Sequence, residues 1–183
     1  MMNPVELILD NLHDVNKVAF SGTHGTGKTT SVFDMATRCK KRCNDRSIHI
    51  LTELASESPF KINKQTTEES QLWIFTNQIK TELEMSMRYS IVITDRTIVD
   101  SIGYSKTAGF NHLVEQKIEL TKSFIHTYDY IFFKQSDKNN YLFTDGIRDG
   151  IDTDFRLRVE DNMILIYDKL LPYMKNKDVL RFI

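Results

Sequence analysis

Short runs of apolar residues alternate along the chain with longer stretches in which apolar positions recur every three or four residues. Such runs are typical of buried strands, and the three-to-four spacing is typical of helices that pack on one face. Strands are predicted at 17–21, 47–52, 91–94, 128–133 and 178–183. Helices are predicted at 28–43, 68–89, 98–107, 112–126 and about 155–170. This alternation predicts an α/β fold, a five-stranded parallel sheet with helices on both faces.

Length and composition favour one globular domain that spans residues 1–183. The chain has 183 residues, of which 40% are hydrophobic and 27% are charged, and it shows no internal repeat or linker. Its formal net charge of −1 excludes a protein held to nucleic acid or membrane by overall charge alone. The basic segment 38–46 is expected to offset the end of a helix, and it leaves a local DNA contact open.

The chain carries no sequence signal for a membrane or for secretion. Its longest apolar runs are far shorter than the ~20 residues that a membrane-spanning helix needs. Residues 1–15 contain acidic side chains and no lysine or arginine, the reverse of a secretory signal. Cys39 and Cys43 are four apart on a predicted helix, too far for a disulfide, so we expect buried, reduced thiols. These features predict a cytoplasmic protein.

The segment Gly22-Thr-His-Gly-Thr-Gly-Lys-Thr29 matches the pattern G-x-x-x-x-G-K-[ST] and falls between a predicted strand and a predicted helix. In such a P-loop, backbone N–H groups bind phosphate oxygens and the lysine neutralises the outer phosphates. We therefore expect Lys28 to contact ATP and Thr29 to bind Mg²⁺, and we expect His24 to be a spacer that faces solvent. The residues expected to bind the nucleotide are Gly22, Thr23, His24, Gly25, Thr26, Gly27, Lys28, Thr29 and Thr30.

Two more segments follow predicted strands and indicate which phosphate chemistry takes place. Asp95 ends the third strand, where its carboxylate is expected to bind Mg²⁺ with Thr29, and Arg96 is expected to lie near the phosphoryl acceptor. Glu53 follows the second strand, where it can accept the proton of an attacking hydroxyl. No N-K-x-D signature is present, because Asn176-Lys-Asp-Val fails at its last position, which disfavours a regulatory GTPase.

Leu51-Thr-Glu53, Phe75-Thr-Asn-Gln78 and Asp95-Arg96 resemble, in order and approximate spacing, the deoxynucleoside kinase and thymidylate kinase superfamily. The resemblance implies the strand order 2-3-1-4-5 in a three-layer P-loop fold. It further implies that Glu53 is the general base, that Gln78 pairs with the base of the acceptor and that Arg96 clamps the acceptor. The sequence departs from deoxynucleoside kinases at Asp95-Arg-Thr97, where they have Glu-Arg-Ser, and in lacking the tryptophan after their catalytic glutamate.

The polar stretch before the last predicted helix resembles the mobile lid of these kinases, at about 136–156. Arginines of such a lid close over the transferred phosphoryl group and exclude water. We expect Arg148 and Arg156 to take this role. Arg158 is a weaker third residue for substrate binding, because it is two positions from Arg156 on a helix start and points elsewhere. The same assembly, with Asp145-Gly-Ile-Arg148 before the last helix, also resembles the small AAA-type kinase-like proteins that include nicotinamide riboside kinases.

The sequence thus predicts an ATP- and Mg²⁺-dependent kinase that acts on a nucleoside, a nucleotide or a related hydroxyl acceptor. One alternative is a kinase for a hydroxymethylated pyrimidine base in DNA. Another is a P-loop ATPase or a nucleotide-binding switch without kinase activity. Relatives with this fold often form homodimers, and the sequence leaves that assembly open.

Overall fold

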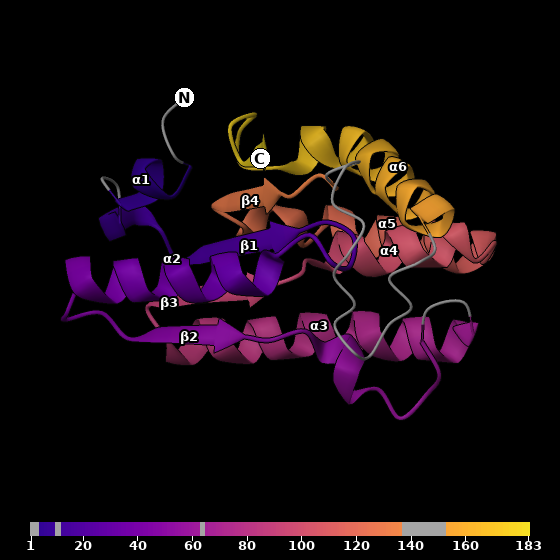
Figure 1. Ribbon diagram of the computed structural model, residues 1–183, viewed down its shortest axis with the longest axis horizontal. Coiled ribbons are helices and arrows are strands. Elements are labelled where there is room, and N and C mark those ends of the chain that lie inside the picture. Colours follow the sequence, from indigo (N-terminus) through magenta and orange to yellow (C-terminus); the bar gives the residue numbers. More distant parts are fainter. Residues whose placement is uncertain (1–3, 10–11, 63–64, 137–152) are drawn as a thin grey trace.

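The computed structural model describes residues 4–9, 12–62, 65–136 and 153–183. A five-stranded parallel sheet, in the order β2-β3-β1-β4-β5, forms its centre (Figure 1). The strands are β1 (Lys17–Ser21), β2 (Ile48–Leu51), β3 (Ile91–Asp95), β4 (Tyr130–Phe133) and β5 (Leu180–Phe182). The predicted fold class and strand order are therefore confirmed.

In the described ranges, six α-helices connect or flank these strands. They are α1 (Pro4–Leu9), α2 (Lys28–Arg42), α3 (Glu68–Arg88), α4 (Ile98–Thr107), α5 (Asn111–Lys122) and α6 (Thr153–Leu170). The helix predicted at 112–126 ends earlier, at Lys122, and is followed by a 3₁₀ turn, Ile125–Thr127. Most of the predicted lid, residues 137–152, lies outside the described residues.

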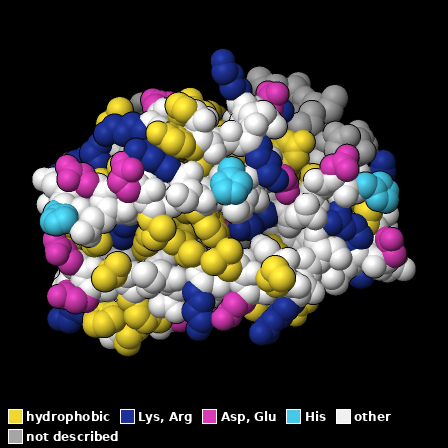
Figure 2. All heavy atoms as spheres, turned by 180° about the vertical axis from the view of Figure 1, so that it is seen from behind, with side chains coloured by type: hydrophobic (Ala, Val, Ile, Leu, Met, Phe, Trp, Pro, Cys, Tyr) yellow, Lys and Arg dark blue, Asp and Glu magenta, His cyan; other side chains and the backbone are white. Residues whose placement is uncertain are grey.

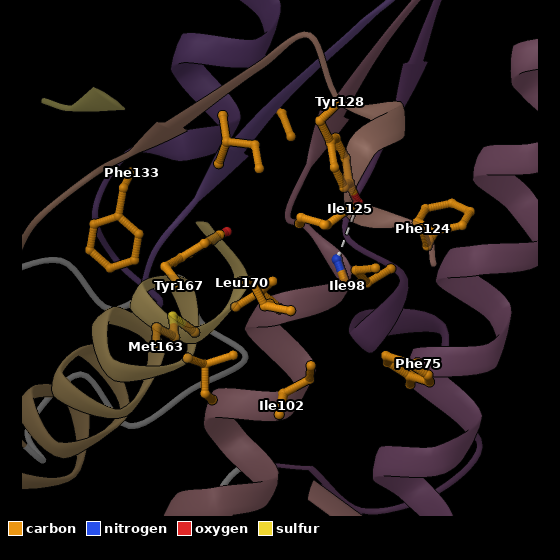
Figure 3. Packing of buried hydrophobic residues seen from close by; sticks show 14 of the residues in the cluster. Phe75, Ile98, Ile102, Phe124, Ile125, Tyr128, Phe133, Met163, Tyr167 and Leu170 are labelled. Atoms are coloured by element: carbon orange, nitrogen blue, oxygen red, sulfur yellow. Dashed lines mark hydrogen bonds between the residues drawn. The ribbon is translucent and has the colours of Figure 1, made fainter. Parts of the chain in front are cut away.

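Side chains that alternate along the strands build one core on each face of the sheet. Val18 and Phe20 of β1 pack in a cluster with residues of α1 and α2. Ala19 faces the larger cluster, which receives residues from α3, α4, α5 and α6. Figure 3 shows part of this second core, in which Phe133 of β4 and Tyr167 of α6 lie close together. The sheet is therefore the middle of three layers, and its residue pattern follows from burial on both sides.

The helix α3 buries several polar side chains together with the apolar Ile74 and Phe75. Gln71, Gln78 and Glu82 are buried, whereas Leu83 and Met87 are exposed, Met87 to 88%. On the face seen from behind in Figure 2, apolar side chains form separate groups among charged ones. The 3.6-residue period identifies α3 as a helix, but its inward face is set by buried hydrogen bonds described below.

The basic end of α2 has a structural explanation. Lys40 donates hydrogen bonds to the carbonyl oxygens of Asn44 and Arg46, at 2.8 and 3.2 Å. Arg46 donates to the carbonyl oxygens of Leu12 and Ser90. Cations at this position offset the exposed carbonyls of a helix end. Because α2 begins at the P-loop and has 15 residues, its basic end lies roughly 22 Å from the phosphate site.

Two further expectations concern the cysteines and the membrane. Cys39 and Cys43 are both buried and form no disulfide, as predicted. Burial and the neighbouring Cys43 raise the pKa of the Cys39 thiol to about 11, so it stays protonated and unreactive. None of the helices in the described ranges has the length and apolar character that crossing a bilayer requires.

Candidate active site

The loop between β1 and α2 forms a cradle that only glycine can build at its key positions. Gly22, Gly25 and Gly27 all have positive φ, which a side chain disfavours. A Cβ atom at Gly22 would also collide with the carbonyl oxygen of Lys134, the residue that follows β4. Gly27 is the N-cap of α2, so the first turn of that helix has no side chain over its free N–H groups. The cradle is therefore open to an anion.

Lys28 lies inside this cradle and is bound by the loop itself. Its Nζ donates to the carbonyl oxygen of Thr23 at 2.5 Å and to Thr26 Oγ1 at 3.4 Å. Burial, together with the positive charge of Arg96, lowers the pKa of Lys28 to about 7, although nearby carboxylates oppose this shift. The Oγ1 atom of Thr23 is buried without a hydrogen-bond partner among the described residues. A buried lysine and an unpaired hydroxyl in one cradle fit a phosphate group.

Thr29 and Asp95 meet at the carboxyl edge of the sheet. Thr29 Oγ1 donates a hydrogen bond to Asp95 Oδ2, which brings the first turn of α2 to the end of β3. Within the described ranges, no group of three or more His, Cys, Asp or Glu side chains could hold a metal ion. One hydroxyl and one carboxylate fit Mg²⁺ that is also held by nucleotide phosphates, since this ion is usually bound through one or two carboxylates and phosphates.

Arg96 is the centre of the hydrogen bonds on the acceptor side of the P-loop. Its Nε donates to Glu53 Oε1 at 2.6 Å, and its Nη1 donates to the Gly22 carbonyl oxygen at 3.1 Å and to Asp100 Oδ1 at 3.3 Å. The guanidinium also lies 5.5 Å from the ring centre of Tyr104. Arg96 has φ 102°, a strained conformation for a non-glycine residue. Glu53 and Arg96, both predicted site residues, are thus brought together.

The buried carboxylate of Asp100 holds Arg96 and the P-loop in place, and the motifs considered above did not include it. It accepts hydrogen bonds from five groups, namely Ser21 Oγ, Gly22 N, Arg96 Nη1, Thr97 N and Thr97 Oγ1. Thr97 and Asp100 form a capping box at the start of α4. The spacing Thr97-x-x-Asp100 was a visible signal for this cap.

A pocket with about 330 Å³ of empty space lies beside the P-loop. Glu53, Arg96 and Asp100 line its charged side, Gln71 and Ser101 contribute polar groups, and Ala55, Ile62, Ile74 and Tyr104 complete the lining. The 330 Å³ includes space that is open to solvent, and the centre of a water-sized sphere can move through only about 30 Å³ of the pocket.

Gln71 gives this pocket an unpaired polar atom. Its Nε2 donates to Thr66 Oγ1 at 2.8 Å, whereas its Oε1 is buried and has no hydrogen-bond partner in the described part of the chain. A buried amide oxygen without a partner is costly and is therefore informative.

Gln78, predicted to contact the acceptor, does not line this pocket. Gln78 is buried away from the pocket lining, and its Nε2 donates to Glu82 Oε1 at 2.7 Å and to the Arg96 carbonyl oxygen at 3.4 Å. Glu82 also accepts from Tyr128 and from Lys17. Gln78 thus contacts the strained Arg96 backbone instead of the pocket.

His24 departs from its expected exposure. The expectation that it faces solvent is wrong, because it is 6% exposed and its Nδ1 lies 3.1 Å from the hydroxyl of Tyr104. The P-loop is short and crowded at this point, and the Tyr104 hydroxyl offers the imidazole a buried partner. Since Tyr104 lines the pocket, His24 links the phosphate cradle to it.

The arginines predicted to close over the phosphoryl group have different surroundings. Arg156, in the first turns of α6, is buried, and its Nε has no hydrogen-bond partner among the described residues. Arg158 is exposed, so the two point in different directions, as their spacing suggested. Arg148 lies outside the described residues. Ser136, at the start of the predicted lid, is held against α6, because its N and Oγ donate hydrogen bonds to Glu160 Oε2.

The sequence matches the family model of the AAA domain over residues 17–174. The chain belongs to this AAA domain family. Its structure is similar to that of a thymidylate kinase from Ehrlichia chaffeensis, with 21% identity, a TM-score of 0.64 and coverage of 92% of each chain. It is also similar to a deoxyadenosine kinase from M. mycoides, with 16% identity, a TM-score of 0.60 and coverage of 91% of this chain and 90% of the other.

A thymidylate kinase from Candida albicans is a third similar structure, with 15% identity, a TM-score of 0.58 and coverage of 92% of this chain and 85% of the other. No curated protein matches the sequence. At these identities the similarity concerns the fold. This AAA domain protein therefore has the nucleotide-binding P-loop fold of nucleoside and nucleotide kinases, and the resemblance stated from its motifs is confirmed.

Proposed function

We propose that this AAA domain protein is an ATP- and Mg²⁺-dependent kinase that transfers the γ-phosphoryl group to a hydroxyl of a nucleoside-like acceptor. One observation carries the proposal: a small pocket beside the P-loop is lined by the Glu53–Arg96 ion pair and by Gln71, whose buried Oε1 has no hydrogen-bond partner among the described residues. A carboxylate, a cation and a polar group for recognition then face a single cavity next to the phosphate cradle.

The donor side of the site binds ATP. The P-loop amides and Lys28 hold the phosphates, and Lys28 exchanges its contact with the Thr23 carbonyl oxygen for phosphate oxygens. Thr29 and Asp95 hold Mg²⁺, which neutralises charge on the phosphates. Arg156, and Arg148 from the lid segment, stabilise the charge of the phosphoryl group during transfer.

On the acceptor side, the charges favour a hydroxyl over a phosphate acceptor. The lining residues carry the two carboxylates Glu53 and Asp100, and both are bonded to the one lining cation, Arg96. Among the lining residues that the structure describes, no further cation is left for a phosphate group on the acceptor. A hydroxyl also has to lose a proton, and Glu53 is the general base that takes it. Arg96 orients Glu53 and clamps the acceptor.

Recognition of the acceptor base is better assigned to Gln71 than to Gln78. Gln71 lines the pocket and has a buried oxygen without a partner among the described residues, and an N–H group of a base would supply its missing hydrogen bond. Gln78 contacts Glu82 and the Arg96 backbone and takes no part in lining the pocket. Its proposed role is to hold the strained Arg96 peptide in place. Arg158, which is exposed, is left as a weak contributor to substrate binding.

The test is to incubate the protein with radiolabelled ATP, Mg²⁺ and separate acceptors. The panel contains the four deoxynucleosides, thymidine monophosphate, nicotinamide riboside and duplex DNA with hydroxymethyluracil. Transfer of label to a nucleoside is the expected result. Label on the monophosphate alone, or on DNA, would assign a different acceptor. Release of free phosphate with no labelled acceptor would overturn the kinase proposal in favour of an ATPase.

A further inference from the structure

Lys117 is a buried cation directly behind the acceptor pocket, and the proposed reaction does not use it. It lies on α5 and is 2% exposed. Its Nζ donates to the Gln71 carbonyl oxygen at 2.8 Å, to Ser101 Oγ at 2.7 Å and to Ser105 Oγ at 2.9 Å. The ammonium also lies 5.1 Å from the ring centre of Phe75. Its three protons therefore meet three acceptors, which come from α3 and α4.

This arrangement is unusual because the contacts of the ammonium are uncharged. They are one carbonyl group, two hydroxyl groups and an aromatic ring, and no carboxylate forms an ion pair with Lys117 among the described residues. A buried charge without a counter-charge is costly. Burial lowers the pKa of Lys117 to about 7, which agrees with this cost. A methionine side chain would fill the same space without the cost of burying a charge. This indicates that the ammonium group has a function.

The direction of the hydrogen bonds at Ser101 indicates what this function is. In its charged form, which predominates below its folded pKa of about 7, the Lys117 side chain only donates, so Ser101 Oγ must accept from it and must place its own proton elsewhere. The one other acceptor found for it is the Gln71 carbonyl oxygen, which lies 3.4 Å away and already accepts from Lys117 at 2.8 Å. Ser101 lines the pocket, so an acceptor atom on a ligand would be a better partner for its proton.

We propose that Lys117 is a positioning residue that directs the Ser101 hydroxyl proton into the acceptor pocket, where Ser101 acts as a specificity-determining hydrogen-bond donor and Gln71, which also lines the pocket, acts as the acceptor. The inference rests on the proposed kinase function and deepens it. A donor next to an acceptor on the pocket wall selects a ligand whose edge carries an acceptor next to a donor. The hydrogen-bonding edge of a nucleobase has this character, and a simple sugar alcohol without a base does not.

Ser105 provides a matched control for Ser101. Both serines lie on α4 and both accept from Lys117, but Ser101 lines the pocket and Ser105 does not. Steady-state kinetics at pH ~6, where Lys117 is charged, would use whichever of the four deoxynucleosides the wild-type protein phosphorylates fastest. Ser101→Ala is expected to raise the KM for that nucleoside by about 3- to 10-fold, the loss of one net hydrogen bond, with the KM for ATP within about 2-fold. Ser105→Ala is expected to leave both values within about 2-fold.

A double variant then tests whether Lys117 acts through Ser101. Lys117→Met alone is expected to raise the nucleoside KM as Ser101→Ala does, and adding it to Ser101→Ala should raise the KM no further. A merely structural role of Lys117 would instead give effects that add. The thermal midpoint of each variant shows whether it is folded. If Lys117→Met does not fold, the nucleoside KM values of Ser101→Ala and Ser105→Ala alone test the proposed role of Ser101.

The possible failures are distinguishable. If the wild-type protein phosphorylates no nucleoside, the proposed function fails and this inference falls with it. If the wild type transfers phosphate normally but Ser101→Ala leaves the nucleoside KM unchanged, or Ser105→Ala raises it equally, the inference alone is overturned. Additive effects of Lys117→Met and Ser101→Ala would also overturn it.

Discussion

Glu53 and Arg96 lie 43 positions apart in the chain, yet Arg96 Nε and Glu53 Oε1 are separated by only 2.6 Å. The contact exists because β2 and β3 are neighbouring parallel strands, whose carboxyl ends bring the two residues to the same edge of the sheet. Arg96 also donates to Gly22 and Asp100, so the carboxylate of Glu53 is tied to the P-loop through a single guanidinium.

Glu53→Gln is expected to lower turnover by about 10²- to 10⁴-fold, because an amide still accepts a hydrogen bond from Arg96 but cannot take a proton from the acceptor. The KM for ATP should stay within about 2-fold, since Glu53 lies on the acceptor side. Steady-state kinetics measures both. Glu57→Gln, at an exposed position of the same loop, is the control and should retain full turnover. Near wild-type turnover in Glu53→Gln would exclude Glu53 as the base.

Gln71→Leu and Gln78→Leu are expected to have different effects although both residues lie on α3. Gln71→Leu removes the free oxygen from the pocket and should raise the KM for the nucleoside by roughly 10-fold. Gln78→Leu removes a donor to Glu82 and to the Arg96 carbonyl oxygen, so it should lower kcat and cost about 1–3 kcal/mol in the free energy of unfolding. Kinetics and urea unfolding separate the two. The reverse pattern would restore Gln78 as the residue that reads the base.

Removal of Mg²⁺ with a chelator is expected to abolish phosphoryl transfer, and added Mg²⁺ should restore it. Thr29→Ala should raise the Mg²⁺ concentration needed for half-maximal rate by about 10-fold or more, because the metal loses a hydroxyl ligand. Thr37→Ala is the matched control, since Thr37 is exposed on the same helix and, within the described part of the chain, its hydroxyl donates to the Phe33 carbonyl oxygen alone. An unchanged Mg²⁺ requirement in Thr29→Ala would remove this residue from the metal site.

The titration of Lys117 predicts a pH-dependent stability. Its pKa is about 7 in the folded protein and near 10.5 when the side chain is exposed. Between these values the unfolded chain binds the proton and the folded protein does not, so the contribution of this group to stability rises with pH. Below the folded pKa both states are protonated and the contribution is constant.

We therefore expect the unfolding free energy of the wild type, minus that of Lys117→Met, to be flat below pH ~6 and to rise by about 1 kcal/mol or more per pH unit between ~7.5 and ~9.5. Urea unfolding of both proteins across this range measures the difference. A difference that does not vary with pH would mean that Lys117 keeps an ordinary pKa.

The two arginines of α6 should differ because one is buried and the other is exposed. Arg156→Ala is expected to lower kcat by about 10²-fold or more, since it removes a cation proposed to stabilise the transferred phosphoryl group. Arg158→Ala should cost less than about 3-fold. Turnover at saturating ATP and acceptor measures both effects. Equal losses in the two variants would contradict the assignment of Arg156.

Local patterns predict the fold and the phosphate cradle, but they do not predict the acceptor pocket. Strands that are buried on both faces appear in the sequence as runs of apolar residues, and a P-loop is recognised from eight consecutive residues. Gln71 and Lys117, by contrast, owe their roles to the packing of α3, α4 and α5 against one another. Leu83 and Met87 contribute to the helical period of α3 but are exposed, whereas polar residues share its inward face with Ile74 and Phe75. Asp100 was within reach of sequence reasoning, through its capping box with Thr97.

The position of β1 in the sheet has a consequence for how the protein is made. Val18 of β1 pairs with Ile93 of β3 on one side and with Tyr130 of β4 on the other. As the nascent chain leaves the ribosome, the P-loop strand comes early but its second neighbour comes only after two thirds of the chain. Contacts this distant in sequence are slow to close. The phosphate cradle therefore matures late in folding, and a truncated product that ends before β4 would carry its motif without a working site.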